Sequence, residues 1–313
     1  MVKYLSFNSV KIAFAVIFLQ TIVNSQNLSI ASFSRIGFGA RGISLGNAMG
    51  AVTYGEVNGY YNPAVLPFAN LKRGTLTLGF LSLDRTLDFV HYTQSLYPTA
   101  GFSIFLIRAG VDNIDLRDID GFHIDNFKTS EYMFGFSFSN KLTSNFSIGL
   151  SLKFYYSKIY HDFNTRTLGV DFGFIFRLRD NLFLGAVVQD LNAKYRWDSA
   201  NLYGEKGHLV IERFPVTKKL SSFYKLKDIL LLSFDLNLVE SQKRINLGIE
   251  TYPVDKNFSI RGGFEMFNYP AISFGVGLRQ KLRKIIISLD YAYRYEVNVP
   301  ISSVQFLSIG LEI

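Results

Sequence analysis

The sequence predicts an all-β protein, a fourteen-stranded antiparallel transmembrane β-barrel with an N-terminal plug. Three observations predict this fold class. Apolar residues alternate with small or polar ones in segments of about ten residues, fourteen such segments follow one another, and short links alternate with longer ones. Apolar and polar residues also alternate along the strands of a soluble β-sandwich, but those strands are usually only about five or six residues long. The barrel is therefore the better interpretation.

Composition agrees with a β-rich chain and excludes several chemistries. The 313 residues include 30 Phe, 18 Tyr and 25 Gly, a bias toward residues that form strands and turns. Cysteine is absent, which excludes disulfides, zinc–thiolate sites, iron–sulfur clusters and thiol nucleophiles. The net charge of +8 has no accompanying basic helix or RNA-binding motif, so we expect no nucleic acid partner. In an outer membrane these cations would meet lipid and lipopolysaccharide phosphates.

Residues 1–25 have the pattern of a secretory signal peptide. Two lysines precede the apolar run from Ile12 to Leu19, and compact residues precede a cleavage site at Gln26. The run is far shorter than the roughly 20 residues of a transmembrane helix. Residues 26–70, rich in Gly, Ala, Ser and Asn, are interpreted as a hatch or plug, and residues 71–313 as the barrel.

The strand segments each predict one lipid-facing and one lumen-facing surface. Leu150, Leu152 and Phe154 share the apolar face of one segment, whereas Ser151 and Lys153 share the other. Aromatic residues end the apolar faces, as interfacial girdles require. The eighth segment has the least regular alternation, because lysines interrupt its apolar face. The fourteen segments are residues 74–83, 85–95, 99–109, 130–140, 144–157, 166–179, 181–190, 216–226, 229–239, 243–252, 257–266, 270–280, 284–295 and 303–313.

The links between segments predict the orientation. Short links take every second position, and the two longest connections, residues 110–129 and 191–215, fall between them. Outer-membrane barrels have short periplasmic turns and longer external loops, so both ends of the sheet would face the periplasm. The expected location is the bacterial outer membrane.

The predicted lumen face contains five bases and five acids. Buried charges persist when they are paired, so this balanced set predicts an internal ionic lattice closed by the plug. A wide water-filled pore would tolerate the same charges without pairing. The ten residues are Lys153, Asp171, Arg177, Asp235, Glu250, Arg261, Glu265, Arg279, Asp290 and Arg294.

No motif predicts catalysis or a cofactor. The four histidines are scattered, and His161 with Asp162 is the one adjacent pair with acid–base potential. Exposed acidic loops are common without a metal, so we expect no metal ion in the first long connection, with calcium coordination as the alternative. Its five aspartates, without EF-hand spacing, are Asp112, Asp115, Asp118, Asp120 and Asp125. We expect a protein that is not an enzyme.

The hatch segment resembles a known family. Residues Gly39 to Ala48 (GARGISLGNA) and Tyr60 to Ala64 (YYNPA) resemble the start of PorV- and PorQ-type outer-membrane proteins, which are similar to FadL-type fatty-acid channels. Residues 110–121 also resemble a loop of PorV-like proteins. The resemblance implies a fourteen-stranded barrel whose hatch motif is Asn62, Pro63 and Ala64. Without the barrel around it, the same tripeptide is compatible with an ordinary turn.

Two functions follow as hypotheses. The resemblance implies an accessory of type IX secretion that binds or anchors exported proteins at the outer membrane, with secreted proteins or other secretion components as partners. Tyr195, Trp197 and Tyr203 of the second long connection are expected to contact such a partner, with an interfacial girdle as the alternative. The alternative function is a FadL-like channel for hydrophobic small molecules, although a charged lumen suits an apolar tunnel less well. A hydrolase acting at the rim is a distant third.

Overall fold

The structure, a computed structural model, describes residues 30–69, 72–160, 163–200, 204, 207–240, 242–267, 269–297 and 303–313. The predicted signal peptide, residues 1–25, lies outside the described residues. No helix in the described ranges is long and apolar enough to cross a membrane.

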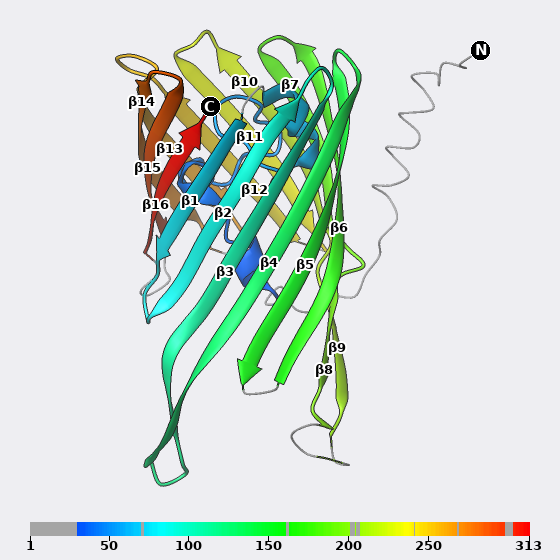
Figure 1. The fold of residues 1–313 in the computed structure, drawn as a ribbon, viewed down its shortest axis with the longest axis vertical. Coiled ribbons are helices and arrows are strands. Elements are labelled where there is room, and N and C mark those ends of the chain that lie inside the picture. Colours follow the sequence, from blue (N-terminus) through cyan, green and yellow to red (C-terminus); the bar gives the residue numbers. More distant parts are fainter. Residues whose placement is uncertain are drawn as a thin grey trace, which may run out of the picture.

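Fourteen strands of the described chain form one closed antiparallel barrel, which confirms the predicted fold class (Figure 1). Each predicted segment overlaps one strand. The segment with the least regular alternation, residues 216–226, corresponds to β10. Neighbours in the barrel are consecutive in sequence, except that β7 lies beside β10 and β16 closes on β1. The strands are β1 (Lys72–Phe80), β2 (Arg85–Leu96), β3 (Ala100–Arg117), β4 (His123–Thr143), β5 (Phe146–Tyr160), β6 (Phe163–Arg179), β7 (Leu182–Leu191), β10 (Thr217–Leu226), β11 (Leu230–Val239), β12 (Gln242–Thr251), β13 (Phe258–Met266), β14 (Ala271–Leu282), β15 (Ile285–Glu296) and β16 (Val304–Glu312).

The two faces of each strand meet different surroundings. In β4, Phe134, Phe136 and Phe138 are 45%, 41% and 46% exposed on the outer surface, whereas Ser137 and Ser139 are buried inside. Backbone N–H and C=O groups pair along the sheet, as a segment in lipid requires. The exposed apolar side chains therefore form a lipid-facing band instead of an internal core.

The two longest predicted loops contain strands. β3 runs to Arg117 and β4 begins at His123, so residues 110–129 mostly extend the barrel hairpin. Residues 191–215 contain a separate two-stranded sheet of β8 (Lys194–Asp198) and β9 (Leu209–Arg213). Both hairpins project from one end of the barrel, and the C-terminus lies at the other (Figure 1). The β3–β4 extension was not predicted from the sequence. Both of its faces are largely exposed, so its residues do not alternate between apolar and polar.

Residues 30–69, hereafter the hatch, lie inside the barrel (blue in Figure 1). The α2 helix packs against β1 and β13 to β16, η2 packs against β4 to β6, and α3 packs against β2 to β4. The hatch thus contacts opposite parts of the wall. Its helical segments are η1 (Ser32–Arg35), α2 (Gly39–Ser44), η2 (Pro63–Val65) and α3 (Leu66–Ala69).

The small residues of the hatch and wall allow their backbones to touch. Gly46 has a φ of 60°, in the left-handed region that favours glycine. A Cβ atom on Gly263 of β13 would lie 2.0 Å from the backbone nitrogen of Gly46, and one on Gly149 of β5 would lie 2.6 Å from that of Ala64. A side chain at either wall position would push the hatch away.

Candidate functional site in the barrel lumen

Glu250 of β12 lies at the centre of an ion-pair network between the hatch and the wall. Its carboxylate accepts hydrogen bonds from Arg41 of α2 (Nη2–Oε2, 2.6 Å) and Arg261 of β13 (Nε–Oε1, 2.7 Å). Arg261 also donates from Nη1 to Oδ1 of Asp290 at 2.7 Å, and Arg41 donates from Nη1 to the carbonyl oxygen of Glu56 at 2.6 Å. These side chains are buried. Removal of the Glu250 carboxylate would leave the Arg41 guanidinium buried without the carboxylate that pairs with it.

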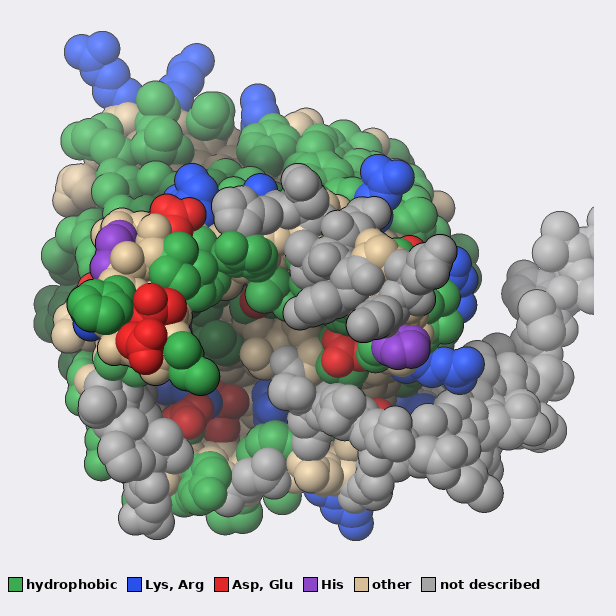
Figure 2. Space-filling view, turned by 90° about the horizontal axis from the view of Figure 1, so that it is seen from below, with side chains coloured by type: hydrophobic (Ala, Val, Ile, Leu, Met, Phe, Trp, Pro, Cys, Tyr) green, Lys and Arg blue, Asp and Glu red, His purple; other side chains and the backbone are tan. Residues whose placement is uncertain are grey.

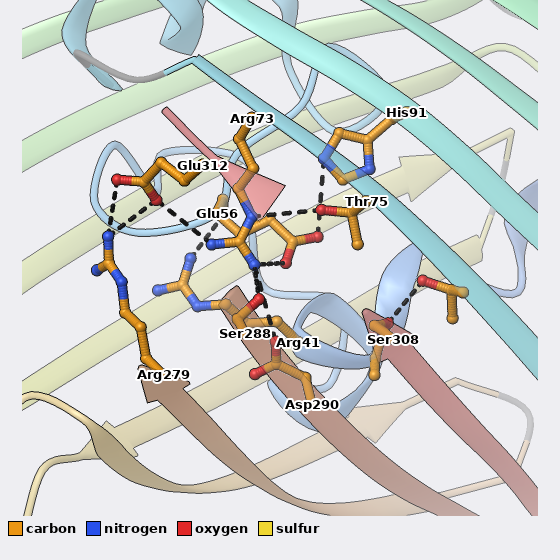
Figure 3. A network of polar contacts seen from close by, with 12 residues as sticks. Arg41, Glu56, Arg73, Thr75, His91, Arg279, Ser288, Asp290, Ser308 and Glu312 are labelled. Carbon is orange, nitrogen blue, oxygen red and sulfur yellow. Dashed lines mark hydrogen bonds and ion pairs between the residues drawn. The ribbon is translucent and has the colours of Figure 1, made fainter. Parts of the chain in front are cut away.

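The same network continues through the hatch residue Glu56 to the strands that close the barrel (Figure 3). Nη2 of Arg73 on β1 lies 3.1 Å from Oε2 of Glu56, and its Nη1 lies 3.5 Å from Oε2 of Glu312 on β16. Arg279 of β14 donates to Oε1 of Glu312 at 2.7 Å. His91 of β2 places Nε2 3.8 Å from Oε1 of Glu56. The hatch is therefore tied to both sides of the closing seam.

Lys153 of β5 forms a second cluster with two carboxylates. Its Nζ lies 2.7 Å from Oδ2 of Asp171 and 3.1 Å from Oδ1 of Asp190. The hydroxyl of Tyr155 donates to the same oxygen of Asp190 at 2.6 Å. Asp190 has a φ of 62° and lies in β7, where the register against β6 shifts. This bulge accommodates an extra residue whose carboxylate joins the lumen cluster.

Two further pairs also include hatch atoms. Nζ of Lys219 lies 3.7 Å from Oδ2 of Asp235, which accepts a hydrogen bond from the backbone N–H of Gly50 at 3.0 Å. Arg294 donates from Nε to Oε1 of Glu265 at 3.0 Å, and the same oxygen accepts from Nδ2 of the hatch residue Asn47 at 3.1 Å. The ion pairs thus fix the hatch as well as neutralising the wall.

Arg177 is the predicted lattice residue that the structure places outside these clusters. It donates from Nη2 to Oδ1 of Asn145 at 3.0 Å and to the carbonyl oxygen of Ser144 at 3.1 Å, at the turn between β4 and β5. An inward position this close to the strand end lies at the rim, beyond the hatch. The other nine predicted residues lie in the clusters described above.

Several partners of these nine residues were not predicted from the sequence. Arg41 and Glu56 belong to the hatch, which has no strand period to show which side chains meet the wall. Arg73 could have been identified, because it shares the inward face of β1 with Thr75 and Thr77. The bulge at Asp190 changes the facing that strict alternation would assign.

The predicted hatch motif connects the hatch to β5 and β6. Oδ1 of Asn62 accepts the backbone N–H of Ala64 at 2.9 Å and caps η2, in which Pro63 takes the first position. Nδ2 of Asn62 donates to the carbonyl oxygen of Gly50 at 2.7 Å. The hydroxyl of Ser147 donates to the carbonyl oxygen of Ala64 at 2.5 Å. The tripeptide is therefore both a turn and a contact with the wall.

A different surface faces the hatch on β2 and β3. The ring of the buried hatch residue Phe38 lies 4.9 Å from that of Phe89 and 5.9 Å from that of Phe105, measured between centroids. The hatch residue Tyr60 lies 5.2 Å from Phe38, and Phe306 of β16 lies 5.8 Å from Phe89. These contacts form an aromatic seat for the hatch without a charge pair between the rings.

Solved structures with the same architecture include two toluene transporters and a FadL homologue. The Pseudomonas putida toluene transporter TodX superposes with a TM-score of 0.61 at 12% identity, over 88% of this chain and 97% of that one. For the Ralstonia pickettii toluene transporter TbuX the TM-score is 0.59 at 12% identity, with the same shares covered. A Pseudomonas aeruginosa FadL homologue gives 0.59 at 13% identity, over 88% and 98%.

The chain has the fold of the FadL-type outer-membrane barrels. A closed barrel with an apolar outer band is a fold of the bacterial outer membrane, which is the location of this FadL-like barrel. The structural neighbours are transporters, not enzymes. No protein-family model and no curated sequence matches the chain, so sequence comparison does not support the resemblance to PorV- and PorQ-type proteins.

Two of the three predicted partner contacts of this FadL-like barrel are buried in the structure. Tyr195 and Trp197 are 2% and 8% exposed, because β8 folds back onto the barrel. The ring of Tyr195 lies 4.8 Å from that of Phe214, and Trp197 stacks on Phe163 at 5.0 Å. These two side chains therefore present little surface to a partner in this structure. Tyr203 lies outside the described residues.

The acidic hairpin of β3 and β4 shows no metal-binding arrangement. Asp115 accepts hydrogen bonds from His123 and Arg117, and these bonds lower the pKa of its carboxyl group. Oδ1 of Asp118 accepts the backbone N–H groups of Asp120 and Phe122 in the turn. Among the described residues, no group of three or more His, Asp or Glu side chains could hold a metal ion. These two aspartates therefore shape the hairpin.

Proposed function

We propose that this FadL-like barrel is an outer-membrane channel for small hydrophobic molecules, and that the hatch is its gate. Of its structural neighbours, TodX and TbuX are toluene transporters, and CymD is a monoaromatic hydrocarbon channel. The observation that carries the proposal is the aromatic seat of Phe38 on Phe89 and Phe105. An apolar molecule can replace the Phe38 ring against Phe89 and Phe105 without separating an ion pair.

The conformation described here is closed. Two polar cavities between the hatch and the wall have volumes of only about 80 Å³ and about 40 Å³. Passage therefore requires the hatch to move. Because an ion pair holds α2 against β12 and aromatic contacts hold Phe38 against β2 and β3, we propose that the hatch withdraws from β2 and β3.

Uptake of labelled toluene by cells with an intact outer membrane tests the proposal. Cells that express the protein should take up toluene faster than cells with the empty vector. Phe89→Arg should reduce uptake to the empty-vector rate, because it places a charge on the apolar surface. Phe183→Arg is the matched control, since Phe183 is also a buried lumen phenylalanine but packs against Phe68 and Phe223. Equal uptake by wild type, both variants and empty vector would refute the channel.

Anchoring of exported proteins in type IX secretion is the second candidate. The resemblance of residues Gly39 to Ala48 and Tyr60 to Ala64 supports it, and an ion-paired hatch suits a barrel that need not open. Under this proposal, secreted proteins or other secretion components would co-purify with the barrel from its native membrane. Toluene uptake would then match that of cells without the protein. Outer-membrane lipid and lipopolysaccharide remain the expected surroundings in both proposals.

A further inference from the structure

A polar chamber lies between the hatch and β5, β7 and β10 to β13. Its volume is about 80 Å³. Its lining includes one carboxylate, Asp190, and four cationic side chains, Arg35, Lys153, Lys219 and Arg244. The chamber lies toward the end of the barrel from which the hairpins project. Figure 2, which views that end, shows a hollow mouth with basic and acidic side chains in its depth.

Within the part of the chain that the structure describes, Arg244 of β12 lacks the ion pair that the other wall cations of the clusters described above form. Among the described residues no carboxylate forms an ion pair with it, and the neighbouring Glu265 is paired with Arg294 at 3.0 Å. Its guanidinium carbon lies 4.3 Å from the centroid of the Phe267 ring, and its Nε is buried without a hydrogen-bond partner. Arg244 is partly buried, and a guanidinium group whose Nε is shielded from water without a partner is costly, so an anion in the chamber would stabilise it.

We propose that this chamber binds a phosphate-type oxoanion, held chiefly by Arg244 with Arg35 and Lys219 as additional cations. A guanidinium group offers parallel N–H donors that match two oxygens of such an anion. Asn47 and Thr217 line the same space and offer neutral donors. At ~10–15 Å³ for each water-sized position, the chamber has room for one tetrahedral oxoanion group, either free or at the end of a larger molecule that stays outside.

The oxoanion has two plausible sources, free phosphate and the phosphate groups of lipopolysaccharide. Both present the same tetrahedral chemistry to Arg244, and both occur outside the cell. The inference does not depend on the channel proposal, because anion binding requires no passage of toluene. The two sources differ in whether the phosphate is attached to a lipid, which a binding experiment can distinguish.

Calorimetric titration of the purified full-length barrel with sodium phosphate, at constant ionic strength, tests the proposal. Wild type should show saturable binding, and Arg244→Gln should bind at least tenfold more weakly, as expected for loss of a charged hydrogen-bond donor. Arg166→Gln, on the exposed outer face of β6, is the matched control and should bind like wild type. A gel shift on heating checks that each variant is folded. If Arg244→Gln does not fold, Arg244→Lys replaces it and should also bind more weakly.

A second titration uses lipopolysaccharide and its dephosphorylated form. Binding of free phosphate that is lost in the Arg244 variant supports the free anion as ligand. Binding of lipopolysaccharide alone, lost both on dephosphorylation and in the Arg244 variant, supports the lipid head group. Equal binding by wild type and the Arg244 variant, or no saturable binding of either probe, would overturn the proposal.

Discussion

The hatch contacts the barrel through two chemically different surfaces. Toward β12 to β16, Arg41 meets the buried carboxylate of Glu250 at 2.6 Å, whereas toward β2 and β3 the ring of Phe38 meets Phe89 and Phe105. Buried ion pairs require one geometry, because displacement exposes each charge to a medium that cannot solvate it. Apolar contacts can be replaced by other apolar groups. The ionic surface therefore fixes the position of the hatch, and under the channel proposal the aromatic surface is the one that exchanges with a ligand.

The largest effect is expected on the ionic surface. Glu250→Ala leaves Arg41 and Arg261 buried without their shared partner. The free energy of unfolding should fall by about 3–5 kcal/mol. Urea unfolding of the protein in liposomes measures this change. A loss below about 1 kcal/mol would show that the ionic surface does not fix the hatch.

The aromatic surface should respond somewhat less. Phe38→Ala should lower the free energy of unfolding by about 3 kcal/mol, through lost burial and the cavity left behind. Under the channel proposal the same variant should increase toluene uptake, because the hatch no longer covers Phe89 and Phe105. Phe183→Ala is the control for uptake. A Phe38→Ala variant that is destabilised but transports no faster would separate the structural role of this seat from gating.

The hatch motif should contribute less than either surface. Asn62→Ala removes the cap of η2 and the hydrogen bond to the carbonyl oxygen of Gly50. The expected loss is about 1 kcal/mol, and chemical unfolding measures it. Asn126→Ala, on the exposed β3–β4 hairpin, should leave stability unchanged. A loss as large as that of Glu250→Ala would mean that the motif, and not the ion pairs, positions the hatch.

The smallest effect is expected for an ion pair outside the lumen. Asp228, in the turn after β10, has a pKa lowered to about 2 because Lys225 and Lys256 donate hydrogen bonds to its carboxylate. A lowered folded-state pKa stabilises the protein above the unfolded value of 3.8, and this contribution is lost as pH falls through about 2. Asp228→Asn should therefore be less stable than wild type at pH 7, and the difference should disappear only below about pH 2, where the carboxyl group is protonated in the folded state as well. Since all three groups reach solvent, the difference should also shrink in high salt.

The barrel could be predicted because its physical cause is local. Apolar and polar residues must alternate along a strand that lies between lipid and lumen. The sequence alone therefore assigns Leu150 to the lipid face and Ser151 to the lumen face. The same period assigned Glu250, Arg261 and Asp290 to the inner wall, and their charge balance indicated that they pair. The sequence pattern also predicts the eighth barrel strand, β10, although its lysines interrupt the alternation.

The contacts of the hatch were decided by tertiary structure. Arg41 and Glu250 are 209 positions apart, and nothing periodic in the hatch shows which of its residues will face the wall. The burial of Tyr195 and Trp197 depends on β8 folding back, where backbone N–H groups of Lys194 and Arg196 bond to threonine hydroxyls of β6. The sequence alone therefore determined the strands and their faces, since these depend on neighbours along the chain. Partners across the lumen depend on how the closed barrel places distant residues in one small volume, which only the tertiary structure decided.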